Sequence, residues 1–235
     1  MELQNIEKTF YSEGENIGGY TFDKRKGYMK DDGRFILNKE PIPYLLAKNY
    51  FSDEDIDSML TELRFITPKM NYNPPSGDIP QEKGEWKQNN QIYLDDLYTD
   101  RSTSTILNCM NKIYDDKDLI HALKSTSWFY NVWNYTNLDQ SFVAYYENTD
   151  FYKAHRDIAI ISIMYWIWEE PKSFTGGDLH LTNYNIEIPM ERNQLLIMPS
   201  SINHAVDAIQ MNKEYENQEF SGMGRYCVAR FLKMK

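Results

Sequence analysis

The sequence has few cysteines and histidines and no long hydrophobic run. Its 235 residues include two cysteines, Cys109 and Cys227, and four histidines. Two cysteines do not make a disulfide framework, so we expect two free thiols in a reducing cytoplasm. No apolar stretch approaches the ~20 residues of a membrane helix, and the first residues lack the basic start and apolar stretch of a signal peptide. These absences predict a cytoplasmic protein without membrane spans.

Positive charge is also scarce. The 25 Lys and Arg residues are outnumbered by 35 Asp and Glu residues, which gives a formal net charge of -10. A broad nucleic-acid interface needs clustered Lys and Arg. We therefore expect a peptide or a small molecule as the partner. Nothing in the residues points to a particular oligomeric state.

Aromatic residues, by contrast, are abundant at 14% of the chain. They are enriched in strands, which favours a fold rich in β-structure. The length fits one domain. Within it we expect an N-terminal extension at 1–45, a helical support region at 46–130 and a strand-rich core at 140–232.

The first half of the chain carries helix signals. Ser52 is a good N-cap, and the acidic residues 53–55 follow it where the helix dipole favours negative charge. Apolar periodicity extends this helix to Leu63 and predicts further helices near 103–115 and 116–125.

Short strands and one long loop complete the first half. Strands are predicted at 20–22, 34–37 and 92–94. The Pro- and Gly-containing stretch 69–90 is a predicted loop, and together with the N-terminal segment it is a candidate lid over a substrate.

The second half alternates short apolar runs with turn residues. Strands are predicted at 141–147, 151–156, 159–168, 178–182, 185–189, 194–198, 202–208 and 225–232. Eight short strands without a helical period indicate a jelly roll or closed barrel. Because helices precede strands, we predict an α+β, mainly β fold: a double-stranded β-helix (jelly roll) with N-terminal helices packed on one sheet.

Two histidines and an aspartate among these strands have the composition of a metal site. His155 and Asp157 lie two residues apart in a predicted strand, so both side chains point to one face. His204 follows an apolar strand that ends at Pro199. Two imidazoles and one carboxylate leave three coordination positions open, as in non-haem Fe(II) oxygenases. Each residue taken alone is more often a structural side chain.

Arg225 opens the last predicted strand, where its guanidinium needs a carboxylate partner or a route to water. Arg225 and Arg230 are an odd number of residues apart and face opposite sides of the sheet, so we expect Arg225 inside and Arg230 towards solvent. His121 and His180 are interpreted as structural, with His180 the lesser candidate for lining the site. The pair Gly176-Gly177 predicts a hairpin turn.

The order of these residues resembles the 2-oxoglutarate- and Fe(II)-dependent dioxygenases, and most of all their prolyl 4-hydroxylase-like branch. The resemblance spans roughly residues 140–232 and rests on Tyr146, Tyr152, His155, Asp157, Gly176-Gly177-Asp178-Leu179, Pro199, His204, Arg225 and Tyr226. It implies a hydroxylase that uses Fe(II) and 2-oxoglutarate, with ascorbate as a further candidate cofactor, and that releases succinate and CO2. The implied target is a C–H bond, of a prolyl residue in a peptide or of a free amino acid.

The resemblance also assigns roles to residues. It makes His155, Asp157 and His204 the iron ligands of the catalytic centre, and Arg225 the residue that binds the distal carboxylate of 2-oxoglutarate. Lys213 is the alternative for this carboxylate, because the gap from His204 to Arg225 is longer than in many prolyl hydroxylases.

Two alternatives stay open at this point. Tyr146 either lies near the cosubstrate, as the resemblance implies, or is an aromatic residue of the barrel wall. The rival function is a cupin-like barrel that binds a metal or ligand without oxygenase activity. Halogenating relatives lack the carboxylate ligand that Asp157 supplies, so the resemblance favours hydroxylation over halogenation.

Overall fold

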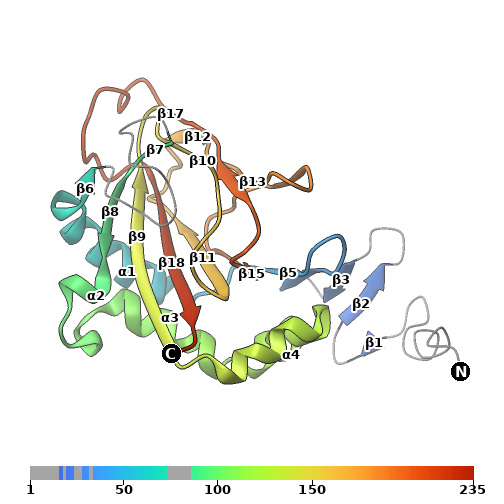
Figure 1. Cartoon of the computed structure of the whole chain (residues 1–235). Coiled ribbons are helices and arrows are strands. Elements are labelled where there is room, and N and C mark those ends of the chain that lie inside the picture. Colours follow the sequence, from blue (N-terminus) through green and yellow to red (C-terminus); the bar gives the residue numbers. More distant parts are fainter. Residues whose placement is uncertain (1–15, 18–19, 24–27, 32–33, 73–85) are drawn as a thin grey trace, which may run out of the picture.

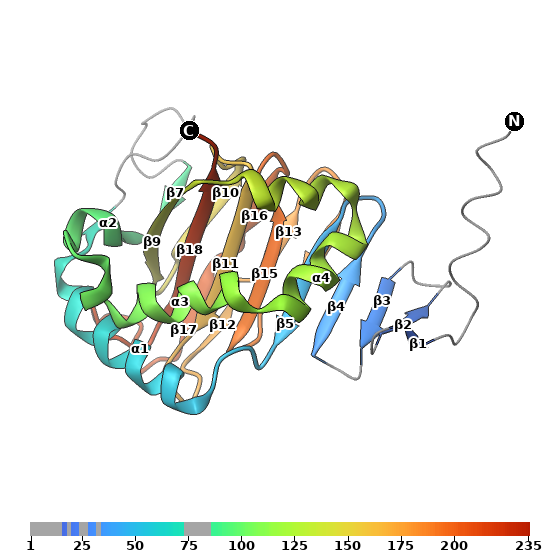
Figure 2. The same ribbon diagram turned by 90° about the horizontal axis from the view of Figure 1, so that it is seen from below.

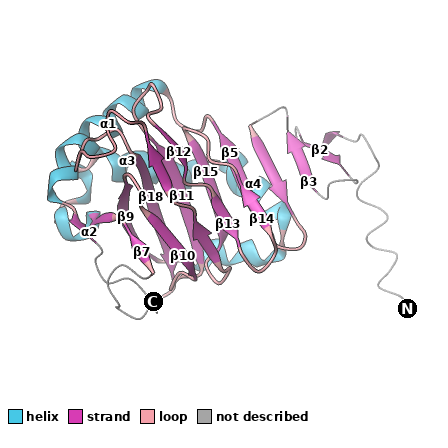
Figure 3. Cartoon of the chain, turned by 90° about the horizontal axis from the view of Figure 1, so that it is seen from above, coloured by secondary structure: helices cyan, strands magenta, loops and turns pink. Residues whose placement is uncertain are grey.

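The computed structural model describes residues 16–17, 20–23, 28–31, 34–72 and 86–235. Antiparallel strands form two facing sheets, and helices lie outside the larger one (Figure 1). Viewed from above, the strands of the smaller sheet lie in front, with the helices on the far side (Figure 3). The predicted jelly-roll core of antiparallel sheets is thus confirmed.

The larger sheet has eleven strands. In spatial order they are β1 (Asn16–Ile17), β2 (Tyr20–Asp23), β3 (Tyr28–Asp31), β4 (Phe35–Asn38), β5 (Tyr44–Lys48), β15 (Gln194–Pro199), β11 (Ile161–Ile167), β18 (Arg225–Lys233), β9 (Leu138–Tyr146), β8 (Asn90–Tyr93) and β6 (Asn71–Tyr72). β18 lies between β9 and β11, so the last strand of the chain sits well inside the sheet.

The smaller sheet has five strands. Their order is β14 (Ile186–Ile188), β13 (Leu179–Leu181), β16 (His204–Val206), β10 (Phe151–His155) and β7 (Lys87–Gln88). A two-stranded sheet joins β12 (Phe174–Gly176) to β17 (Ile209–Met211). β10 and β16 are neighbours, which brings His155 next to His204.

The helices lie mainly between β5 and β9 in the chain. They are α1 (Asp53–Ile66), α2 (Leu94–Leu97), α3 (Thr105–Asp115) and α4 (Lys117–Thr126), with 3₁₀ helices η3 (Thr67–Lys69), η4 (Arg101–Thr103) and η5 (Trp128–Tyr135). Ser52 caps α1 by accepting a hydrogen bond from the Asp55 amide, as its position predicts. α1, α3 and α4 run along one face of the larger sheet (Figure 2).

Two hydrophobic layers follow from the alternation of side chains along the central strands. On β11, Ile163 and Tyr165 join the layer that contains the buried faces of the helices. Met164 and Trp166 join the layer between the two sheets. Because helices cover one face of the larger sheet and the smaller sheet covers the other, β11 is buried on both faces. Any site inside the barrel must therefore open at its end.

The eight strands predicted in the second half are all present, with shifted ends. The sequence did not predict β1, β3, β5, β12 or β17. The described ends of the predicted loop 69–90 contain β6 and β7, so the loop prediction is wrong there. Residues 73–85 of this loop and about half of segment 1–45 lie outside the described residues, so the predicted lid stays a prediction. In the part of the chain that the structure covers, no helix has the length and apolarity to cross a membrane. Cys109 and Cys227 are free and buried.

Candidate metal centre

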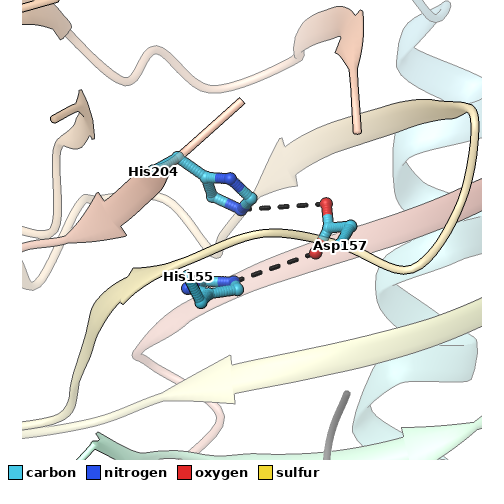
Figure 4. A group of neighbouring side chains, drawn as sticks. All are labelled: His155, Asp157 and His204. Atoms are coloured by element: carbon cyan, nitrogen blue, oxygen red, sulfur yellow. Dashed lines mark ion pairs between the residues drawn. The ribbon is translucent and has the colours of Figure 1, made fainter. Parts of the chain in front are cut away.

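Two neighbouring strands and the loop after one of them bring His155, Asp157 and His204 together. His155 ends β10 and pairs with His204, the first residue of β16. The His155 Nε2 and His204 Nε2 atoms each lie 3.8 Å from an oxygen of Asp157, one on either side of the carboxylate (Figure 4). One ligand atom from each residue falls within 4.8 Å of the others.

The backbone fixes which nitrogen of each histidine faces the centre. His155 Nδ1 lies 2.9 Å from the carbonyl oxygen of Lys153, and His204 Nδ1 lies 3.0 Å from the carbonyl oxygen of Ile202. A carbonyl only accepts hydrogen bonds, so each Nδ1 carries the proton and each Nε2 keeps a free lone pair. This is the arrangement that orients a histidine for a metal.

Asp157 reaches the centre by a different route from the one predicted. We expected strand alternation through residues 151–156, but β10 ends at His155, and Asp157 lies in the loop that follows. Its amide donates to the Ser200 carbonyl at 3.1 Å, which ties this loop to the end of β15. Its Oδ2 accepts a 2.6 Å hydrogen bond from the Ser162 hydroxyl. The carboxylate is therefore held at two points.

The two serines behind Asp157 were not predicted as part of the site. The Ser162 and Ser200 hydroxyls are 2.8 Å apart, and both residues are buried. A serine in an apolar strand gives little sequence signal, although Ser162 interrupts the run of Ile and Met in β11. A buried hydroxyl needs a hydrogen-bond partner, and this interruption was the available clue.

The His155 ring is enclosed. The Tyr152 ring stacks on it with centroids 3.5 Å apart and planes 15° apart. Burial, followed by the nearby His204, lowers the pKa of His155 well below its usual 6.5. The folded chain thus keeps this imidazole neutral, and only a neutral imidazole can bind a metal.

A pocket of about 270 Å³ opens beside the three side chains and runs along the inner faces of β9 and β18. Alternate residues of β18 line it, namely Arg225, Cys227, Ala229, Phe231 and Lys233. Each of the first four pairs with a β9 residue that also lines it, namely Tyr146, Ala144, Phe142 and Gln140. The pocket is therefore a passage along one strand pair, with the His155 and His204 side chains on its opposite wall.

Arg225 lies at one end of this passage. The residue is 1% exposed, and its guanidinium sits over the Tyr146 ring, 4.0 Å from the centroid. Its Nη1 donates to the Gly177 carbonyl at 2.9 Å and to the Met190 sulfur at 2.8 Å, while its Nε has no hydrogen-bond partner. No carboxylate of the described residues forms an ion pair with it. A buried cation without a carboxylate is costly, so this end of the pocket is a candidate site for an anion, and we call it the anion-binding end.

Tyr146 combines the two roles that the sequence left open. It is 3% exposed and belongs to the core between the sheets, so it is a wall residue. It also carries the Arg225 guanidinium on its ring, so it borders the anion-binding end. Burial raises the pKa of its hydroxyl to about 12, which keeps it neutral.

The Gly176-Gly177 pair shapes the same end. Both residues have positive φ, 72° and 80°. A Cβ on Gly176 would overlap the Ala208 carbonyl oxygen, so glycine is required for the close approach of β12 to the chain before β17. The pair joins β12 to β13, which belong to different sheets, so the predicted hairpin turn is wrong. This link directs the Gly177 carbonyl at Arg225.

Other candidates lie elsewhere. Lys213 is exposed and does not line the pocket. His180 lies 2.6 Å from Asp207 and also stays outside the pocket, while His121 is exposed on α4. Arg230 does face away from Arg225, but the expectation that it faces solvent is wrong.

Arg230 is fully buried beneath α3. Its guanidinium donates to Ser141, Asn111 and the Leu107 carbonyl, and it lies 3.2 Å from Asp139. Helix α3 covers this face of β18, so a cation there requires protein partners instead of water.

These features together can do a defined kind of chemistry. Two Nε2 atoms and a carboxylate that face one point suit a divalent metal with an open side. The anion-binding end lies in the same pocket. The arrangement could hold one metal and one dianion that reaches from the metal to Arg225.

Comparison with known proteins supports the fold. No protein-family model matches the sequence, and no curated protein matches it. Solved structures do match. A Pseudomonas putida prolyl-4-hydroxylase is 13% identical, with a TM-score of 0.54 over 83% of this chain and 94% of that one. A Trichoplax adhaerens prolyl hydroxylase, solved with a hypoxia inducible factor peptide fragment, is 14% identical, with a TM-score of 0.56 over 81% and 83%.

A third solved structure agrees with these two. The viral collagen prolyl hydroxylase of Paramecium Bursaria Chlorella virus-1, solved as a 2OG complex, is 11% identical, with a TM-score of 0.50 over 82% of this chain and 96% of that one. At these identities the likeness concerns the fold. The chain has the fold of the prolyl 4-hydroxylase-like 2-oxoglutarate- and Fe(II)-dependent dioxygenases.

Proposed function

We propose that this chain is a 2-oxoglutarate- and Fe(II)-dependent dioxygenase that hydroxylates a C–H bond. The observation that carries the proposal is the pairing of two features in one pocket: a His–Asp–His cluster with both Nε2 atoms free, and a buried arginine without a carboxylate partner. A metal-binding barrel without oxygenase activity has no need of the second feature.

In this proposal His155, Asp157 and His204 hold the Fe(II). When bound, Fe(II) and 2-oxoglutarate supply the oxygen activation that hydroxylates a C–H bond, with release of succinate and CO2. Ser162 keeps the Asp157 carboxylate aimed at the metal, and the Lys153 and Ile202 carbonyls hold the two imidazoles.

Arg225 binds the distal carboxylate of 2-oxoglutarate in this scheme. The Tyr146 ring packs against one face of the guanidinium. The Gly177 carbonyl and the Met190 sulfur accept hydrogen bonds from Nη1, so the other N–H groups of the guanidinium are left for the carboxylate. Leu179, Val206, Met164 and Trp166 line the pocket with apolar surface that excludes water.

The substrate of this reaction is a peptide or a small molecule. The Trichoplax prolyl hydroxylase was solved with a peptide, which makes a prolyl residue one candidate. A free amino acid is the other. Fe(II) and 2-oxoglutarate are the cofactors proposed here, and ascorbate would serve only to keep the iron reduced.

The test is binding first and turnover second. We expect 2-oxoglutarate to raise the melting temperature only when a divalent metal is present, because a ligand that binds the folded state stabilises it. Mn²⁺ can replace Fe(II) in this measurement, and succinate formation with Fe(II) follows. Asp157→Ala should abolish both, whereas Asp207→Ala, an exposed carboxylate outside the pocket, should abolish neither. A metal-dependent shift without succinate formation would leave a binding barrel as the better description.

A further inference from the structure

The pocket has a second end, opposite Arg225, with a different chemical character. We call it the outer pocket and define it by Tyr93, Gln140, Phe142, Arg156, Phe231 and Lys233, all of which line the cavity. Arg225 and Lys233 mark the two ends of β18, so the outer pocket lies far from the anion-binding end. The geometry leaves it for the molecule that is hydroxylated.

Aromatic rings form the floor of the outer pocket. The Phe142 and Phe231 rings have centroids 5.4 Å apart, and the Tyr93 and Phe142 rings 5.5 Å apart. Phe142 and Phe231 extend from neighbouring strands, β9 and β18, on the face that Ala229 and Ala144 also line. The small alanines keep the passage open, and the rings offer an apolar surface.

Two cations lie in the outer pocket without a carboxylate partner. Lys233 Nζ donates to the Gln140 side chain at 3.0 Å and makes no ion pair with a described residue. Arg156 is exposed and has no hydrogen bond or ion pair to any residue that the structure describes. Among the described residues that line the pocket, Asp157 is the only carboxylate. The pocket is thus basic in a chain whose net charge is -10.

The space limits what can bind. A cavity of about 270 Å³ has to hold the cosubstrate as well. Pockets for drug-sized ligands start at about 300 Å³. The remaining volume suits one small unit with an apolar body and an anionic group.

We propose that the substrate is a small apolar carboxylic acid, amino acids included, held with its carboxylate against Lys233 and Arg156 and its carbon skeleton against Phe142 and Phe231. The inference rests on the proposed function and narrows its substrate class. A carboxylate bound at the rim places the carbons behind it towards His155, Asp157 and His204, where a C–H bond would react. A peptide ending in an apolar residue offers the same chemistry, so the experiment must separate the two.

The experiment measures succinate formation and a product one oxygen heavier, with Fe(II) and 2-oxoglutarate held constant. The panel contains apolar carboxylic acids and amino acids, the primary amide of each, and peptides that carry the same residue at a free carboxyl terminus or internally. We expect the small acids to be hydroxylated and to exceed their amides in kcat/KM by roughly tenfold or more, as the loss of a charged hydrogen-bond partner predicts. Peptides should be weaker than the small acids.

Variants test whether the two cations cause this preference. In the double variant Arg156→Gln, Lys233→Gln, the acid-over-amide ratio should fall to about one, because neither side chain then distinguishes charge. The single conservative variant Lys233→Arg should retain most of the ratio. The matched control is Arg64→Gln, Lys124→Gln, which removes two cations that do not line the pocket and should leave the ratio unchanged.

Four results would overturn the inference while leaving the proposed function standing. They are equal rates for acids and amides, a ratio that the double variant does not change, hydroxylation of internal peptide residues only, and substrate-independent succinate formation that no acid of the panel raises. Absence of any 2-oxoglutarate-dependent succinate, together with no metal-dependent melting shift, would refute the proposed function itself.

Discussion

Ser162 holds the carboxylate of Asp157, one of the three proposed metal ligands. It donates to Asp157 Oδ2 at 2.6 Å and is itself buried among apolar neighbours. Removal of such a partner typically weakens metal affinity by roughly 10- to 100-fold, because the ligand is no longer oriented. We therefore expect Ser162→Ala to lose Mn²⁺ affinity by about this factor in calorimetric titrations.

The control for Ser162 is Ser125→Ala, on α4 and away from the pocket. Its metal affinity should equal that of the unmodified chain. If Ser162→Ala also binds Mn²⁺ normally, the Asp157 carboxylate is oriented by the backbone alone, through the Ser200 carbonyl.

Arg225 and Lys213 can be separated by the same kind of comparison. Arg225→Ala should raise the 2-oxoglutarate concentration for half-maximal succinate formation by about tenfold or more, since a charged hydrogen bond is lost, and should leave Mn²⁺ binding nearly intact. Arg225→Lys should raise this concentration less than Arg225→Ala does, but it should still raise it, because the single ammonium of lysine cannot replace the paired N–H donors of the planar guanidinium. Lys213→Ala should be silent. If Lys213→Ala raised this concentration more than Arg225→Ala does, then Lys213, and not Arg225, would bind the distal carboxylate.

At the residue scale, the structure brings together the three side chains that the sequence singled out, but Asp157 arrives by a route that the sequence did not predict. Strand alternation was meant to align His155 with Asp157, yet the strand ends at His155 and the Ser200 carbonyl and Ser162 hydroxyl place the carboxylate. Arg230 could not be placed from its own strand, because whether that face meets water or a helix depends on α3, over a hundred residues earlier in the chain.

The Gly176-Gly177 link is the element whose backbone most constrains the site. Gly176→Ala should destabilise the fold for two reasons: a positive φ costs an L-residue about 1–2 kcal/mol, and the new Cβ overlaps the Ala208 carbonyl. Gly222→Ala is a matched control, because it shares a positive φ of 76° but its nearest contact is the Tyr226 hydroxyl at 3.8 Å.

Denaturant unfolding should rank the two variants. Gly176→Ala should lose more free energy of unfolding than Gly222→Ala, and it should also weaken 2-oxoglutarate binding, since the Gly177 carbonyl moves relative to Arg225. Equal losses in both variants would show that chain conformation alone, and not the close approach, requires glycine at 176.

At the element scale, strands bounded by turn residues were predictable, including the three-residue strands β13, β14 and β16, whereas β12 and β17 were not. β9, β10, β11 and β18 lie between clear turn signals. β12 and β17 have three residues each and exist as strands because they pair with one another, a contact that no local pattern reveals. The start of α1 was predictable because the Ser52 side chain can itself accept a hydrogen bond from an amide of the first turn.

The pH dependence of stability belongs to the whole molecule. Burial keeps His155 neutral in the folded chain, whereas the unfolded chain takes up its proton near pH 6.5. Below that pH the unfolded state binds more protons, so the free energy of unfolding of the metal-free protein should fall as the pH drops. His155→Gln should remove part of this fall, measured by denaturant unfolding at pH 7.5 and 5.5 in the presence of a chelator.

Asp150 should contribute with the opposite sign. Burial raises its pKa to about 6 from 3.8, so the folded chain holds the extra proton between these values. Its contribution to stability should decline as the pH rises from about 4 to about 6. Asp150→Asn should therefore steepen the loss of stability on acidification that His155→Gln reduces. If neither variant changes the slope, the acid response arises from other groups.

The side chains of β18 that face the pocket are spaced evenly along its whole length. Its inward residues recur every second position, a step of roughly 6.6 Å, so the five of them from Arg225 to Lys233 mark about 26 Å. Cys227 and Ala229 lie between the two ends of the pocket, and a larger side chain at either position would shorten the space available to a bound molecule. If the proposed function holds, a larger side chain at Cys227 or Ala229 should therefore shorten the substrate that the pocket accepts, without any change to the proposed metal ligands.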